Sequence, residues 1–179
     1  MITVYPIGTT IYNPEKCYNG YTILCFPAGP PAGPKVTQLI DMNGNVVKEW
    51  NVQAIRARLL KNGNLLVVER RGMESLNRVV EYDWNHNVIW EYEPQGTPHH
   101  DVQRLDNGNT LVLYRELVPE EYRRKIDDPR RRRNVCIHSD VIIEVTPDKQ
   151  IEWEWHGYKH LDINWHCPMC SPADWMHTN

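Results

Sequence analysis

Histidines at two places in the chain have neighbours suited to acid–base or nucleophilic chemistry. One place is the run from His99 to Asp101, and the other is His177 with Asn179 two residues later. An imidazole has a pKa near neutral, so it can act as a general acid or base, and its neutral form can act as a nucleophile. Imidazole and carboxamide N–H groups can also stabilise negative charge that develops on oxygen atoms. Both places therefore suit the transfer of an anionic group.

Each of these side chains also has an ordinary structural explanation. A histidine at the start of a strand, such as His99 or His100, can serve packing alone. Asp101 could orient His100 or a neighbouring histidine, and it could equally brace a turn. Because successive residues of a strand face opposite sides, we expect His99 to point away from His100.

A second candidate site surrounds Cys167 and Cys170. A Cys-x-x-Cys pair with histidines nearby can hold zinc, and His160 and His166 would be the further ligands. The chain offers no second Cys-x-x-Cys pair to complete a typical zinc site, so we expect no metal. A disulfide bond and two packed thiols are the alternatives for the two cysteines.

The composition is that of an ordinary globular chain. Its 179 residues suit one domain, 41% of them are hydrophobic, and the net charge is -3. This balance gives no reason to expect a nucleic acid or an anionic membrane as a partner. No apolar run approaches the roughly 20 residues of a membrane span, and the N-terminus lacks a signal-peptide pattern. The five cysteines do not have the spacing of a disulfide scaffold, so we expect a cytoplasmic protein.

Five stretches of the chain repeat one another in two types. The first type is LIDMNGNVVKEW (39–50), EYDWNHNVIWEY (81–92) and EVTPDKQIEWEW (144–155), and the second is RLLKNGNLLVV (58–68) and RLDNGNTLVL (104–113). Asn-Gly pairs supply the positive φ angles of tight hairpin turns, and branched and aromatic residues flank them. Each stretch is therefore predicted to form a β-hairpin.

Two hairpins, one of each type, make a unit with the period of a β-propeller blade. The first two stretches of the first type begin 42 residues apart (81 − 39), and blades of four short strands repeat at about this interval. We place the units at about 36–70, 77–115 and 139–179. A charged insertion at 116–138, with the run Arg130 to Arg133, should form a surface loop. It is either solvated or a contact for an anionic ligand or partner.

The fold class predicted from this repeat is all-β, a β-propeller of which the chain holds about two and a half blades. His177 falls at the place in the third unit that His100 occupies in the second, whereas the first unit has Ala54 and Ile55 there. A propeller needs at least four blades to close. We therefore expect C-terminal blades or a second chain to complete the ring.

Four motifs in order resemble the arylsulfotransferases. They are IYNPEKCYNGYTILCFP (11–27), LIDMNGNVVKEW (39–50), HHDVQRLDNGNTLVL (99–113) and DWMHTN (174–179), so the resemblance spans nearly the whole chain. It implies a six-bladed propeller with its active site in the central channel. It also implies a ping-pong transfer of a sulfuryl group from an aryl sulfate to a phenol, with a histidine nucleophile and no nucleotide cofactor.

The resemblance assigns roles to three residues of this chain. His100 matches the family's first channel histidine, and His177 and Asn179 match its H-x-N motif. These residues would bind the transferring group. The family's nucleophilic histidine and its arginine lie in later blades and have no counterpart in this chain.

Two other functions remain open at this point. The chain could be a propeller subunit or scaffold that binds another protein, because a fold does not determine a function. It could also be a metal- or redox-dependent enzyme built around Cys167 and Cys170. A channel histidine with a nearby arginine in the remaining blades would favour the sulfotransferase.

Overall fold

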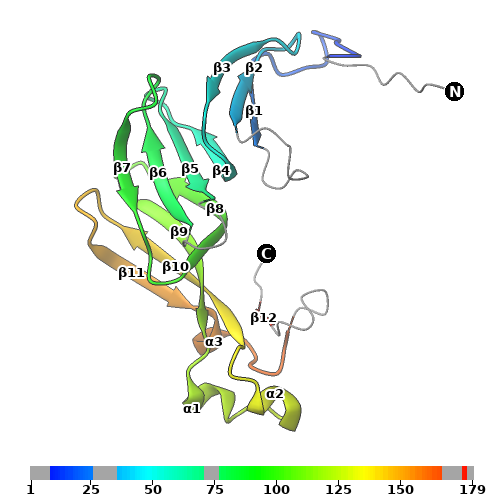
Figure 1. Ribbon diagram of the computed structural model, residues 1–179. Helices are drawn as coiled ribbons and strands as arrows, with labels where there is room; N and C mark the ends of the chain where they lie inside the picture. The colour runs from blue at the N-terminus through cyan, green and yellow to red at the C-terminus, as the bar shows by residue number, and fades with distance from the viewer. Residues whose placement is uncertain (1–8, 26–35, 71–76, 167–174, 177–179) are drawn as a thin grey trace, which may run out of the picture.

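The computed structural model describes residues 9–25, 36–70, 77–166 and 175–176 (Figure 1). The strands are β1 (Thr22–Cys25), β2 (Thr37–Ile40), β3 (Val46–Trp50), β4 (Ala54–Leu59), β5 (Leu65–Glu69), β6 (Arg78–Tyr82), β7 (Val88–Tyr92), β8 (Thr97–Arg104), β9 (Thr110–Leu117), β10 (His138–Val145), β11 (Ile151–His156) and β12 (Trp175–Met176). The helices are α1 (Glu120–Arg123), α2 (Pro129–Arg133) and α3 (Gly157–His160). Since strands carry the architecture and the helices are single turns, the all-β prediction is confirmed.

The strands form three sheets in which consecutive strands pair antiparallel. The first sheet has the order β1-β2-β3, the second β4-β5-β6-β7, and the third β8-β9-β10-β11. The short strand β12 pairs in parallel with β10. The five predicted hairpins are all present, as the pairs β2–β3, β4–β5, β6–β7, β8–β9 and β10–β11.

The sheets do not coincide with the predicted units. The unit 36–70 was predicted to hold β2 to β5, but β2 and β3 belong to the first sheet, whereas β4 and β5 belong to the second. The unit 77–115 likewise spans two sheets, because β6 and β7 belong to the second sheet, whereas β8 and β9 belong to the third. The unit 139–179 begins at β10, in the middle of the third sheet. The chain changes sheets after Trp50, where the Val52 N–H donates to the Trp50 carbonyl in a tight turn. A repeat shows which hairpins are equivalent, but it does not show which hairpins share a sheet.

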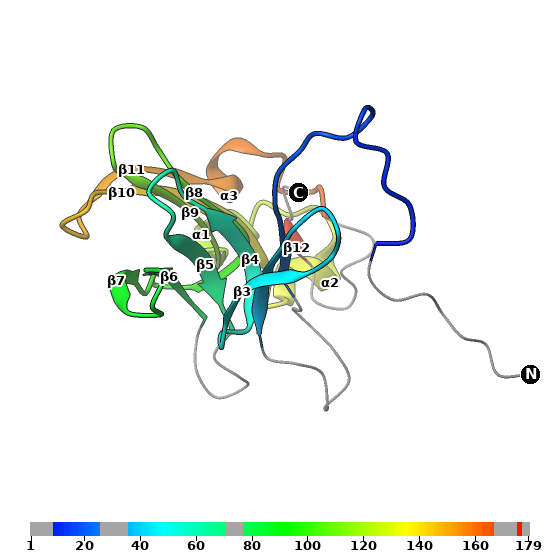
Figure 2. The same ribbon diagram turned by 90° about the horizontal axis from the view of Figure 1, so that it is seen from above.

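The second sheet lies between the other two, and its strand β5 is buried on both faces (Figures 1 and 2). Leu65 and Val67 pack toward the first sheet, in a core that includes Trp50. Leu66 and Val68 pack toward the third sheet. Alternate residues of a strand face opposite sides, so a strand between two cores is apolar throughout. This explains the uninterrupted apolar run at 65–68.

The five hairpin loops share one backbone conformation. In each loop the fourth residue adopts a positive φ, and its N–H donates to the carbonyl of the residue three positions earlier. That residue is Gly44, Gly63 or Gly108 in the Asn-Gly loops, with φ of 83°, 85° and 90°. His86 and Lys149 occupy the same place in the other two loops, with φ of 70° and 66°. The glycine of each Asn-Gly pair therefore supplies the left-handed residue.

The insertion between β9 and β10 has a small core of its own. Val118, Ile126 and Ile137 are buried there, together with Tyr158 of α3 and Met176 of β12. Its arginine run, predicted as a surface feature, is partly structural, because several guanidinium groups donate to backbone carbonyls. Those contacts are Arg131 to Asn164 O, and Arg132 to Ile126 O and Asp127 O. Of the helices in the described part of the chain, none has the length and apolar character needed to cross a membrane.

The loop conformation predicts opposite effects for two substitutions. Lys149→Gly should raise the free energy of unfolding by about 0.5 kcal/mol, because a left-handed backbone costs a side-chain-bearing residue more than it costs glycine. Gly63→Ala should lower it by about 1 kcal/mol for the same reason. A methyl group at Gly63 would meet nothing within 4 Å, so crowding cannot produce that loss. Urea unfolding measures both changes. If both substitutions changed the free energy of unfolding in the same direction, residues 63 and 149 would not share the left-handed conformation described above.

Candidate active site

His99 and His100 lie near the start of β8, at a bulge. The pairing of β8 with β9 shifts register between Pro98 and Val102, and His100 has a φ of 55°. His99 is buried and His100 is exposed. Their rings meet edge to face, with centroids 4.9 Å apart. The prediction that His99 points away from His100 is wrong, because the left-handed residue interrupts the alternation of the strand.

A buried carboxylate lies against His99. Nε2 of His99 is 3.3 Å from Oδ1 of Asp140 on β10, and the Asp140 side chain has no solvent exposure. A carboxylate at one ring nitrogen can hold an imidazole in one orientation. The contacts therefore run from Asp140 to His99 and on to the ring of His100. Asp140 was not predicted, and its only signal in the sequence is its position as a polar residue directly before the apolar run 141–143.

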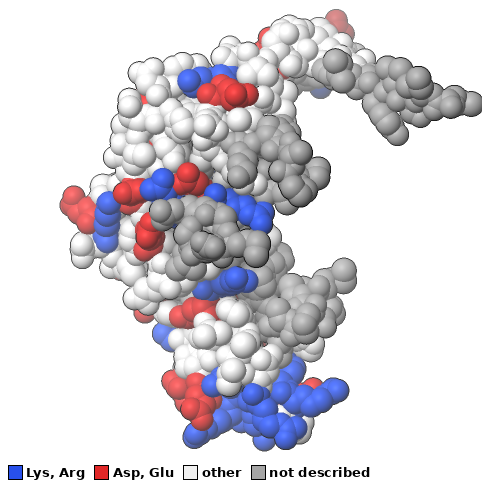
Figure 3. Space-filling view, viewed as in Figure 1, with Lys and Arg blue, Asp and Glu red and all other residues white. Residues whose placement is uncertain are grey.

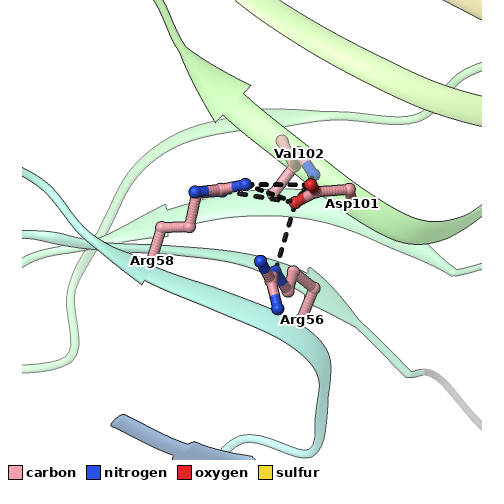
Figure 4. Close-up of polar contacts among 4 residues, drawn as sticks. All are labelled: Arg56, Arg58, Asp101 and Val102. Atoms are coloured by element: carbon pink, nitrogen blue, oxygen red, sulfur yellow. Dashed lines mark hydrogen bonds and ion pairs between the residues drawn. The ribbon is translucent and has the colours of Figure 1, made fainter. Parts of the chain in front are cut away.

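Asp101 has a different role from either of those considered for it. Figure 4 shows its carboxylate between Arg56 and Arg58, two side chains of β4. Oδ2 of Asp101 is 2.8 Å from Nη2 of Arg58, and Oδ1 is 3.2 Å from Nε of Arg56. Partial burial would raise the pKa of Asp101, but hydrogen bonds from Arg58 and from the Val102 N–H outweigh it and lower the pKa. Asp101 thus joins the second sheet to the third.

Arg115 and His138 extend the polar region around Asp140. Arg115 pairs with Asp140 across β9 and β10, and His138 is two residues before Asp140, so the three share one face. Arg115 and His138 border an open hollow of about 370 Å³. It is lined by Gln95, Gly96, Thr97, Arg115, Glu116, Leu117 and His138. Burial, and then the charge of Arg115, lower the pKa of His138, so its imidazole is neutral at pH 7. Neither Arg115 nor His138 was predicted.

A second polar cluster lies on the opposite face of the third sheet. Nδ1 of His156 contacts the carboxylate of Glu116, and Nε2 is 3.2 Å from Oε1 of Glu154. Burial, reinforced by the charge of Glu116, raises the pKa values of Tyr114 and Tyr158 to about 12. Both hydroxyl groups are therefore protonated at neutral pH. This cluster does not share the face that carries Asp140.

Four of the residues proposed from the sequence lie outside the described residues. They are His177, Asn179, Cys167 and Cys170. The preceding strand β12 is described, and it pairs with β10 beside His138 and Ser139. His160 and His166 are exposed, and His160 stacks on Trp155. The described residues contain no group of three or more His, Cys, Asp or Glu side chains that could hold a metal ion.

A family comparison covers most of the chain. The model of the arylsulfotransferase family (ASST) matches residues 24–179. The chain belongs to the arylsulfotransferase family. The match includes β2 to β12 and every histidine discussed above, so the arylsulfotransferase resemblance is confirmed at the level of the family. Of the motif at 11–27, residues 24–27 fall within the match.

Other comparisons add little to the family assignment. No curated protein matches this arylsulfotransferase sequence. Among solved structures, it is similar to a protein of unknown function from Bacteroides caccae, with 17% identity and a TM-score of 0.43. The alignment covers 80% of this chain and 43% of that chain. The chain thus spans less than half the length of that structure, and the TM-score is too low to support an argument about fold.

The contact between His99 and Asp140 predicts a measurable coupling. In a double-mutant cycle of His99→Gln and Asp140→Asn, the coupling free energy should reach about 1 kcal/mol, because both side chains are buried and their polar atoms are close. The matched control is Lys61→Gln with Asp106→Asn, an ion pair whose side chains are both more than nine-tenths exposed. That pair should show almost no coupling, because water screens it. Equal couplings in the two cycles would argue against a buried dyad.

The environment of His138 predicts a pH dependence of stability. The pKa of His138 is lower in the folded chain than the ordinary value of 6.5. As the pH falls, His138 therefore becomes protonated in the unfolded chain before it does so in the folded chain. The free energy of unfolding should therefore fall as the pH is lowered from 6.5 through the folded pKa. Nuclear magnetic resonance titration of the histidine Cε1–H signals measures that pKa directly. His138→Gln should remove this part of the pH dependence; an unchanged pH profile would contradict it.

Proposed function

We propose that this chain is part of an aryl-sulfate sulfotransferase. It would move a sulfuryl group from an aryl sulfate to a phenol through a histidine nucleophile outside this chain. The observation that carries the proposal is the contact of His99 with buried Asp140 and of the His100 ring with His99, inside the region that matches the family. No nucleotide or other cofactor is required by this proposal.

The arrangement suits a residue that handles an anionic group in transfer. In the first half-reaction the sulfur–oxygen bond to the aryl group breaks and a sulfur–nitrogen bond to the nucleophile forms. The departing phenoxide then takes up a proton. In the second half-reaction the acceptor phenol loses a proton, its oxygen forms a bond to sulfur, and the sulfur–nitrogen bond to the nucleophile breaks. His100 is exposed and its ring is held from behind by His99, so it can donate to a sulfuryl oxygen or transfer a proton. His138, neutral at pH 7, is a possible proton acceptor.

The packing of the sheets supports a propeller as the framework. Each described sheet is an antiparallel meander, and a hydrophobic core lies between neighbouring sheets. Blades of a propeller pack in this way. We propose six blades, with His177 and Asn179 joining His100 in binding the transferring group. The ring would be completed by further C-terminal blades or by a second chain.

A second candidate function is protein binding by the insertion. Lys and Arg side chains gather at the lower end of the molecule in Figure 3, around α1 and α2. Arg124 and Arg130 keep 74% and 88% of their side-chain area exposed. The insertion has its own core, so it can present these charges on an ordered surface. This function does not exclude the first.

The sulfotransferase proposal predicts the effect of removing His100. The assay follows release of 4-nitrophenolate from 4-nitrophenyl sulfate with phenol as acceptor, in the longest native polypeptide or complex that carries this chain. His100→Ala should lower the rate by about 100-fold or more, the usual range for losing a proton-transfer group. His86→Ala is the control, because His86 lies in a hairpin loop, and its rate should stay within about two-fold. Equal rates for the two variants would remove His100 from the mechanism.

A further inference from the structure

Arg56, Arg58 and Asp101 form a cluster with more positive than negative charge. Two guanidinium groups share one carboxylate, so the cluster carries a net charge of +1. The side chains of Arg56, Arg58 and Asp101 are 48%, 33% and 47% exposed. The cluster is therefore open to water, and a dissolved anion can reach it.

The two arginines are not equally engaged by Asp101. Arg58 makes three hydrogen bonds to the carboxylate, from Nε and Nη2. Arg56 makes one, from Nε. Within the described part of the chain, the two terminal amino groups of Arg56 have no hydrogen-bond partner. A guanidinium group presents five N–H donors in a plane, so Arg56 retains a free edge for a second anion.

Other cation–carboxylate contacts in the described residues lack this excess of positive charge. Arg78 contacts two carboxylates, those of Glu69 and Glu91. Lys61 pairs with Asp106 alone. Arg104 pairs with Glu81 and lies over the Trp90 ring. At the Arg56–Arg58 pair an added anion would thus meet net positive charge.

The cluster is also adjacent to the candidate active site. Asp101 directly follows His100 in β8, and the arginines lie on β4, the first strand of the neighbouring sheet. Figure 4 shows both guanidinium groups directed at Asp101, in the middle of β8. An anion held by Arg56 would therefore lie next to Asp101, the residue that follows His100 in the chain.

We propose that Arg56 and Arg58 form a capture site for the sulfate group of the donor, and that Asp101 limits its strength. The identity of the anion as an aryl sulfate rests on the proposed function, whereas the binding of sulfate itself does not. A guanidinium edge can donate two parallel N–H bonds to two sulfate oxygens. Asp101 offsets part of the positive charge of the two guanidinium groups, so the aryl sulfate is held weakly enough to move on to the histidines.

The test is equilibrium binding of inorganic sulfate and of 4-nitrophenyl sulfate to the full chain, by calorimetry at low ionic strength. Arg56→Gln should weaken both by about five-fold or more, because a half-exposed charged contact is lost. Arg56→Lys should keep part of the binding, since the charge remains but the second donor pair does not. Lys61→Gln is the matched control, because it removes one charge from an exposed ion pair, and it should change neither affinity. Phenol, which is uncharged at neutral pH, should not discriminate among these variants.

Asp101→Asn separates the capture site from a purely structural brace. If Asp101 limits anion binding, this variant should bind sulfate about three-fold or more tightly, because one competing charge is removed. A brace alone predicts lower thermal stability with no gain in sulfate affinity, and that result would overturn the proposal. Wild-type sulfate affinity in Arg56→Gln would overturn it as well.

The outcomes also distinguish this proposal from the sulfotransferase proposal. Sulfate captured through Arg56, with no transfer in the assay with 4-nitrophenyl sulfate, would leave the capture site standing and remove the proposed activity. Transfer with an unchanged KM in Arg56→Gln would keep the activity and remove the capture site. If both proposals hold, Arg56→Gln should raise KM about five-fold with kcat almost unchanged, as expected for a contact made equally in the bound and transition states.

Discussion

The burial of β5 on both faces is the constraint on which the rest of the structure depends. A strand with one core on each side must have a sheet packed against each face, so the second sheet cannot exist without its neighbours. This brings β4 against β8, and with them Arg56 and Arg58 against Asp101. The polar contacts of the candidate site are thus a consequence of apolar packing between sheets.

The bulge at His100 is the second element that organises the site. In a regular strand the two histidines would lie on opposite faces of the sheet, so their rings could not touch. The positive φ of His100 places both rings in contact. A buried carboxylate is costly unless a polar partner accompanies it, and His99 supplies that partner for Asp140. The bulge and the buried acid therefore depend on each other.

The sequence predicted the parts of the fold that depend on local chemistry. The hairpins could be found because Gly44, Gly63 and Gly108 mark left-handed positions between apolar runs. The grouping of hairpins into sheets could not, because it is decided by packing between residues far apart in the chain. Asp140 and His138 were missed for the same reason. They become neighbours of His99 and Arg115 only through strand pairing, and a lone polar residue before a strand carries no sign of its partner.

The shared core of the insertion ties together three distant segments of the chain. Ile126 and Ile137 of the insertion pack with Tyr158 and with Met176, which is the last residue described before His177. Whatever moves α1 and α2 must therefore also move β12, because close-packed side chains transmit displacement. The arginine-rich helices and β12, the strand before His177, are therefore expected to move together. A partner that bound the arginines could thus displace β12 without touching it.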